Sequence, residues 1–227
     1  MIPVGLFPAP SLWFAGAHLA KVISVQDPES LGRVQVQLLA VDPDGEALAW
    51  ARVAVPYAGD NYGAFLIPGI GEEVLVVFTG NDANQPIVIG ALWNGATAVP
   101  ESLAGDKIDR WSLCGKNGTR IAILEESNGS EAVTITTPGG AEATLTDSSG
   151  GEIVLMVAGN TITMSTSGIS IETSSECSIS ASTVSVSAGS VTVDAGMSKF
   201  SGDDQCDTLV SNSVVSSSYT PGAGNVW

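Results

Sequence analysis

Basic residues are scarce in this chain. Its 227 residues include 8 lysines and arginines against 24 aspartates and glutamates, which gives a formal net charge of −16 at pH 7. Affinity for nucleic acid rests on contacts between cationic side chains and phosphates, and attraction to an anionic membrane surface needs the same side chains. The composition therefore argues against both partners. Hydrophobic residues still make up 44% of the chain, so it is not a disordered acidic tail.

Residues suited to catalysis are also few. His18 is the only histidine, and no nucleophile-elbow sequence accompanies it, so a Ser-His-acid triad is not indicated. We expect His18 to be structural or to contact a partner. Adjacent carboxylates do not make an acid–base pair, because neighbouring residues of a strand face opposite sides; the three such pairs are Glu72-Glu73, Glu125-Glu126 and Asp203-Asp204. The sequence therefore predicts no catalytic residue and a protein that is not an enzyme.

Patterns for disulfides and metal ions are missing as well. Cys114, Cys177 and Cys206 form an odd number at wide spacing, which is typical of free thiols. Residues 42–46 resemble the start of a calcium loop but lack its remaining ligands and its distant glutamate, so they are predicted to form a turn. We expect no metal ion and no cofactor.

No apolar run is long enough to cross a bilayer as a helix. The first twenty residues are apolar, but Pro3, Pro8 and Pro10 interrupt them. Residues 1–19 either belong to the chain's own core or form an arm that docks on a hub protein or a neighbouring protomer. We favour the arm, because exposed apolar segments usually mark interfaces. The predicted anchors of this arm are Leu6, Phe7, Trp13 and Phe14.

Short strands separated by turns fill residues 20–97. Alternating or β-branched runs predict strands at residues 20–25, 33–38, 49–55, 73–78 and 87–92, with a short extended piece at 64–67. Asp42-Pro43-Asp44-Gly45 is a turn, since proline fixes φ and glycine accepts a positive φ. Five short strands in so few residues predict a closed five-stranded barrel of the oligonucleotide/oligosaccharide-binding (OB) type. Residues 98–110 are predicted to be a connector.

The composition changes in the second half of the chain. Residues 160–220 contain 26 serines and threonines, and two apolar residues around one small polar residue recur every 7 or 8 positions from 162 to 193. Such a repeat indicates stacked short strands. One chain alone buries too little to offset backbone ordering of about 1–2 kcal/mol per residue. We therefore predict a homotrimer in which residues 111–218 form an intertwined triple-stranded β-helix, with a core of Ile162, Met164, Ile169, Ile171, Ile179, Val184, Val186, Val191 and Val193.

The chain resembles a known family, the baseplate assembly protein V or central spike protein of contractile phage tails, which is related to type VI secretion spikes. The order and spacing of several segments between residues 20 and 95 carry the resemblance: Asp27-Pro28, Leu31-Gly32-Arg33-Val34-Gln35-Val36, Trp50-Ala51-Arg52-Val53-Ala54-Val55-Pro56, Pro68-Gly69-Ile70-Gly71-Glu72-Glu73, Gln85-Pro86-Ile87-Val88-Ile89-Gly90 and Leu92-Trp93-Asn94-Gly95. The ending, from Ser217 to Trp227, is similar to the terminus of such spikes.

The resemblance implies an all-β structural protein, a trimeric needle in the virion's tail baseplate. Its barrels would dock on a baseplate hub protein, and its shaft would contact and pierce the host envelope on contraction. Residues 219–227 would form the tip, with Val226 and Trp227 at its end, and a small protein of the proline-alanine-alanine-arginine repeat type would cap it. Alternatives are a spike-borne enzyme that degrades the envelope, the spike of an extracellular or type VI injection system, and a receptor-binding fibre.

Overall fold

The computed structural model describes residues 14–217, and the chain divides into two units, Met1–Glu176 and Cys177–Trp227. Among residues 14–217, all regular structure lies in the first unit and consists of β-strands with two short 3-10 helices, Thr79–Asn81 and Ser148–Gly150. The all-β fold class expected from the sequence is confirmed. None of the described residues belongs to a helix long and apolar enough to span a membrane.

The first part of the fold is a closed barrel of five strands in the order β1-β2-β3-β7-β6. The strands are β1 (Ala17–Ser24), β2 (Val34–Leu38), β3 (Ala49–Val53), β6 (Glu73–Phe78) and β7 (Pro86–Leu92). Strands β3 and β7 pair in parallel and close the barrel, whereas the other neighbours are antiparallel. A separate two-stranded ladder, β4 (Ala58–Gly59) with β5 (Tyr62–Gly63), lies between β3 and β6 in sequence. The predicted barrel is present, and residues 64–67 lie outside its strands.

Alternating valines build the core of the barrel. Val34 and Val36 on β2 and Val74 and Val76 on β6 are fully buried, and the residues between them face outward. This alternation follows from the two-residue period of a strand. Burying each such side chain stabilises the fold by roughly 1.5–3 kcal/mol. The buried core cluster also contains Phe78, against which Phe14 packs from the start of the described chain.

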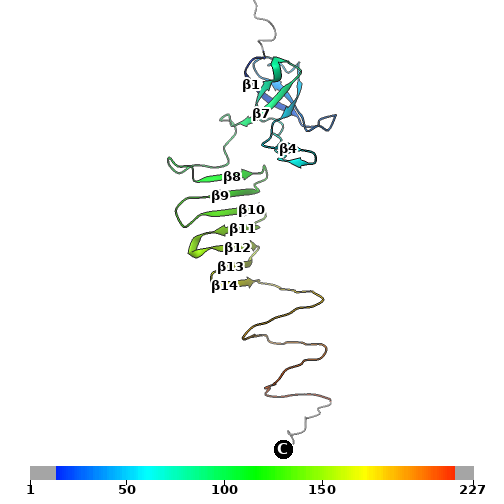
Figure 1. Cartoon of the computed structure of the whole chain (residues 1–227), viewed down its shortest axis with the longest axis vertical. Helices are drawn as coiled ribbons and strands as arrows, with labels where there is room; N and C mark the ends of the chain where they lie inside the picture. The colour runs from blue at the N-terminus through cyan, green and yellow to red at the C-terminus, as the bar shows by residue number, and fades with distance from the viewer. Residues whose placement is uncertain (1–13, 218–227) are drawn as a thin grey trace, which may run out of the picture. The chain divides into compact units, whose positions relative to one another are not determined.

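The second part is a seven-stranded antiparallel sheet in which every strand pairs with its neighbours in sequence (Figure 1). Its strands are β8 (Arg110–Cys114), β9 (Arg120–Leu124), β10 (Ala132–Thr136), β11 (Glu142–Thr146), β12 (Glu152–Val157), β13 (Asn160–Ser165) and β14 (Gly168–Glu172). Short turns join them. In the turn between β10 and β11, Gly140 has φ +80°, a conformation that glycine adopts without steric cost.

The sheet ends at Glu172, within the repeat region. The first two repeats form strands β13 and β14, but the three repeats from Cys177 to Val193 form no strand in the single chain. A strand exists only where a neighbour completes its hydrogen bonds, and the three repeats from Cys177 to Val193 pair with no strand in the described part of their own chain. Figure 1 shows this stretch as an extended trace that turns back and forth. Winding of three chains around one another there stays a prediction.

Candidate assembly interface

One face of the seven-stranded sheet is apolar along its whole length. The pairing register places Ile123 of β9 opposite Trp111 of β8 and Val133 of β10, and the same alignment continues to β14. Two columns of side chains result, and we call them together the apolar face. The first column is Trp111, Ile123, Val133, Leu145, Ile153, Met164 and Ile169; the second is Leu113, Ile121, Ile135, Ala143, Leu155, Ile162 and Ile171.

This apolar face has no cover within the described part of the chain. Ile123 retains 46% of its accessible surface and Ile171 retains 61%, and the buried core cluster consists of barrel residues alone. The middle row of the opposite face is small and mostly polar: Ser112, Ala122, Thr134, Thr144, Val154, Thr163 and Ser170. A continuous exposed apolar stripe on one face of a sheet marks a surface that another chain covers.

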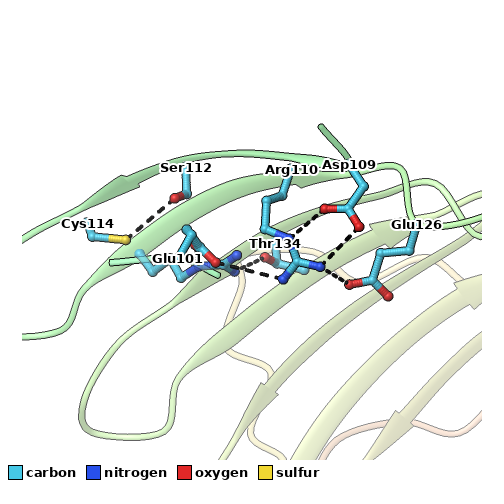
Figure 2. Close-up of polar contacts among 8 residues, drawn as sticks. Glu101, Asp109, Arg110, Ser112, Cys114, Glu126 and Thr134 are labelled. Atoms are coloured by element: carbon cyan, nitrogen blue, oxygen red, sulfur yellow. Dashed lines mark hydrogen bonds and ion pairs between the residues drawn. The ribbon is translucent and has the colours of Figure 1, made fainter. Parts of the chain in front are cut away.

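Glu101 fastens the segment before β8 onto the opposite face of the sheet (Figure 2). The Nε of Arg120 donates to Glu101 Oε1 at 2.6 Å, and Arg110 Nη1 lies 3.9 Å from Glu101 Oε2. Arg110 also donates to Asp109 at 2.7 Å and to Glu126 at 2.9 Å. We call this group of five residues the arginine clamp. It joins the connector, β8, β9 and the turn after β9.

Charge pairing favours the ionised form of two carboxylates of the arginine clamp, Glu101 and Asp109. The hydrogen bond from Arg120 lowers the pKa of Glu101, and the hydrogen bond from Arg110 lowers the pKa of Asp109. In turn, Asp109 raises the pKa of Arg110. The clamp is therefore a set of paired opposite charges and not a site where a proton is held ready for transfer.

A second ion pair organises the loop between β1 and β2. Asp27, whose side chain is 4% exposed, accepts Arg33 Nη2 at 2.7 Å. It also accepts the backbone N–H groups of Glu29, Leu31 and Arg33. The bond from Arg33, with these backbone bonds, holds the pKa of Asp27 well below its usual range. Asp27 and Arg33 belong to the segments that carried the family resemblance, and their contacts fix the loop's shape.

Glu72 links the turn before β6 to the turn between β8 and β9. Its Oε1 lies 2.8 Å from Lys116 Nζ, and its Oε2 accepts the backbone N–H of Gly69 at 2.8 Å. The hydrogen bond from Lys116 lowers the pKa of Glu72. A Cβ at position 69 would collide with the Lys116 ammonium, so glycine at this position leaves room for the lysine.

All but one of the residues predicted from the sequence as site residues fall into three groups. Leu6, Phe7, Trp13, Val226 and Trp227 lie outside the described residues. Four predicted shaft-core residues lie on the apolar face, namely Ile162, Met164, Ile169 and Ile171. The remaining five lie in the stretch without strands and are exposed in the single chain: Ile179, Val184, Val186, Val191 and Val193. Whether these nine form one core in an assembly stays a prediction.

Phe14, the fourth predicted docking residue, packs on the barrel. Its ring centroid lies 4.7 Å from that of Phe78, and the ring of His18 meets Phe78 edge-on at 5.5 Å. His18 Nε2 is buried without a hydrogen-bond partner in the described structure. Phe14 thus joins the segment before β1 to the barrel, and docking of that segment on a hub stays a prediction.

The sequence did not predict the arginine clamp or the part of the apolar face that precedes residue 162. The alternation in Arg120–Leu124 and Ala132–Thr136 carried a signal for strands with one apolar side. The clamp had no signal of its own, because Glu101 is separated from Arg120 by eighteen residues of irregular and strand sequence. Among the described residues, no group of three or more histidines, cysteines or carboxylates could hold a metal ion.

Comparisons with known proteins match one family model to the barrel and another to most of the sheet and the repeats that follow it. Residues 18–93 match the injector OB domain of type VI secretion systems and phage baseplates, and residues 132–197 match the phage baseplate V C-terminal trimerisation domain. The chain is 34% identical over 109 residues to the type VI secretion system spike protein VgrG4b of Pseudomonas aeruginosa, covering 45% of this chain and 14% of that protein. It is 30% identical over 128 residues to the spike protein VgrG3 of Vibrio cholerae, covering 52% of this chain and 13% of that protein. The chain thus spans about one seventh of the length of these curated relatives.

Proposed function

We propose that three copies of this chain form the central spike of a contractile tail, because residues 18–93 match an injector OB domain and residues 132–197 match a phage baseplate V C-terminal trimerisation domain. The spike is a structural part of the baseplate, and it is carried to the target envelope with the tail. The observation that carries the proposal is the apolar face, which is exposed in one chain and extends through all seven strands of the sheet.

Three chains cover this face better than one chain or two. Each chain supplies a stripe two side chains wide, and three stripes facing a common axis bury one another while the polar faces remain outside. At about 4.8 Å per strand, seven strands give each stripe a length of roughly 30 Å. In this proposal the repeats from Cys177 to Val193 obtain strand partners from other copies and form a shaft.

The barrel and the segment before it are proposed as the end that docks on the baseplate hub protein. Phe14 packs against the barrel core, and the apolar residues that precede it in the sequence are proposed to contact the hub. The far end of the shaft, with Val226 and Trp227, is proposed as the tip, to be capped by a small tip protein. These assignments follow the resemblance to spike proteins together with the order of the two domains.

The negative charge of the chain beyond residue 126 suits the outer surface of such a shaft. Beyond residue 126 the chain has ten aspartates and glutamates and a single cation, Lys199. A needle with this surface has little attraction for the anionic surface of a cell envelope, so envelope contact depends on the mechanical work of contraction. The proposal assigns the chain no catalytic step.

The spike of a type VI or extracellular injection system is the second candidate. Its support is the similarity to proteins named type VI secretion system spike proteins. The two candidates predict the same trimer in different particles. Electron microscopy of particles from cells that express an epitope-tagged chain distinguishes them, because a phage tail carries a capsid and the other machines do not.

Native mass spectrometry of the purified chain tests the proposal directly. The expected species is three times the 23.1 kDa mass of one chain, and it should persist at nanomolar concentration because the apolar face has no other cover. A monomer at micromolar concentration would contradict the spike assignment and the shaft together.

A further inference from the structure

A groove follows one edge of the seven-stranded sheet. It has a volume of about 750 Å³ and is lined by the ends of β9, β11 and β13 and the starts of β10 and β12. Its floor is the first column of the apolar face, from Ile123 to Met164, and its lining includes Glu125, Glu131 and Asp147 at the turns. We call it the edge groove. The apolar floor and acidic border make it different from every other part of the sheet.

The opposite edge of the sheet has complementary properties. Its turns are short and made of small residues: residues 115–118 between β8 and β9, 137–141 between β10 and β11, and 158–159 between β12 and β13. These turns contain one charged residue, Lys116, and no carboxylate. Nothing lies within 4 Å of the position that a Cβ would take at Gly139, Gly140 or Gly159. This glycine edge is narrow and protrudes into open space.

Three-fold symmetry requires two different surfaces to meet. A closed ring of three is head-to-tail, so one patch on each copy contacts another patch on the next. A two-fold contact between edge grooves would instead place like charges opposite each other, which is unfavourable. The groove and the glycine edge satisfy the three-fold requirement, since one is hollow and acidic and the other is narrow and free of carboxylates.

The positions along the sheet also match. When the three-fold axis runs parallel to the apolar face, the neighbouring copies cover that face along its whole length. Rotation about this axis leaves every residue at the same height in the stack of strands. Residues 137–141 of one copy are therefore at the level of Val133 and Leu145 of the next, and residues 158–159 are at the level of Ile153 and Met164. All four of these partner positions line the edge groove.

We propose that the edge groove of each copy receives the glycine edge of the neighbouring copy, with Gly139 beside Thr146 and Gly159 beside Ser165. This inference rests on the proposed trimer and adds which surfaces close it. The trimerisation-domain match over residues 132–197 contains nearly the whole groove, so the contact continues the interface that this domain provides. The occupant is a second copy of this chain, and neither the chain's own C-terminal segment nor another protein is needed to fill the groove.

Cross-linking between introduced cysteines tests the pairing. The starting protein carries serine at the three exposed cysteines, Cys114, Cys177 and Cys206. A Gly139→Cys, Thr146→Cys double variant is treated with a short bismaleimide. The control is Gly139→Cys with Thr166→Cys, because Thr166 borders the same groove but lies about three strands, roughly 14 Å, away from the level of residue 139.

We expect covalent dimers and trimers on denaturing gels from the matched pair, and a reduction of at least tenfold in the mismatched pair and in each single variant. Equal cross-linking of both pairs, self-linking of Gly139→Cys alone, or no link from the matched pair in a protein of trimeric mass would overturn the proposed packing. A monomeric mass before cross-linking would instead overturn the trimer itself, so the two failures are distinguished.

Discussion

Glu101 and Arg120 lie nineteen residues apart and meet in a hydrogen bond of 2.6 Å between Glu101 Oε1 and Arg120 Nε. Through this contact the segment that leaves the barrel is fixed to the second strand of the sheet. The ion pair between Glu72 and Lys116 is a second contact between the barrel part and the sheet. The arginine clamp therefore holds the connector against the first two strands of the sheet.

Replacing Glu101 by glutamine should loosen the connector. The amide keeps one hydrogen bond to Arg120 but removes the charge that both arginines face, so residues 98–110 should exchange their amide hydrogens several-fold faster. Hydrogen exchange with mass spectrometry measures this. Glu46→Gln is the matched control, because Glu46 is an exposed carboxylate of the loop between β2 and β3. Unchanged exchange in the Glu101 variant would show that the clamp does not hold the connector.

Stability should fall in acid. Asp27, Glu101 and Asp109 have pKa values below their ordinary values of 3.8 for Asp and 4.5 for Glu. A carboxylate with a depressed folded-state pKa contributes stability that is fully present above its unfolded pKa and is lost as the pH falls through its folded pKa. The contribution of these three carboxylates to the melting temperature should therefore be constant above about pH 6 and should decrease below about pH 4.5.

The variant Asp27→Asn identifies one source of that acid sensitivity. It should be less stable than the parent at pH 7, because Arg33 loses the more buried of its two charged partners, Asp27 and Glu29, and the difference should shrink toward pH 2. Melting curves over this range measure the effect. A difference that stays constant from pH 7 to pH 2 would mean that ionisation of Asp27 does not contribute.

A lysine on the apolar face should disrupt assembly. Ile162 and Thr163 are adjacent on β13 and face opposite sides of the sheet. Ile162→Lys would bury a cation in each of three copies at a cost of several kcal/mol each, whereas Thr163→Lys leaves its charge on the outer face. Native mass spectrometry should find monomers for the first variant and trimers for the second. Trimers of parental thermal stability in both would contradict the assignment of the apolar face to the interior.

Gly69→Ala and Lys116→Ala should have the same small effect and should not add. The alanine methyl group displaces the Lys116 ammonium, so either change removes the ion pair with Glu72, which is worth about 0.2–1 kcal/mol for exposed groups. Chemical denaturation of the two single variants and the double variant gives the coupling. A double variant that costs the sum of the two singles would show that Gly69 and Lys116 act independently.

The barrel could be predicted from the sequence because each of its strands carries its own evidence. Val34 to Leu38 alternates buried and half-buried positions, and Asp42-Pro43-Asp44-Gly45 ends the strand with residues that suit a turn. The strands from Arg120 to Glu172 also alternate. Their common apolar side could not be read from any one strand, because it depends on the register between strands, which the sequence of a single strand does not contain.

Two features could not be predicted from local sequence patterns. β8 follows a polar connector, and Trp111 and Leu113 gave too short a run to predict a strand. The repeats from Cys177 to Val193 have the composition of strands but no partner in their own chain, so their hydrogen bonds depend on other copies. Local sequence indicates that these segments can form strands, but it does not identify the strands that pair with them.

The order of the strands in the sheet has a consequence for how the protein folds. Every strand from β8 to β14 pairs with the strand next to it in sequence, so its contacts are local and close quickly. Each chain can therefore complete its sheet before it meets another copy. For the proposed trimer we expect two kinetic phases of folding: a fast phase independent of concentration, in which the sheet forms, and a slower phase that depends on concentration, in which the repeats from Cys177 to Val193 pair with other copies.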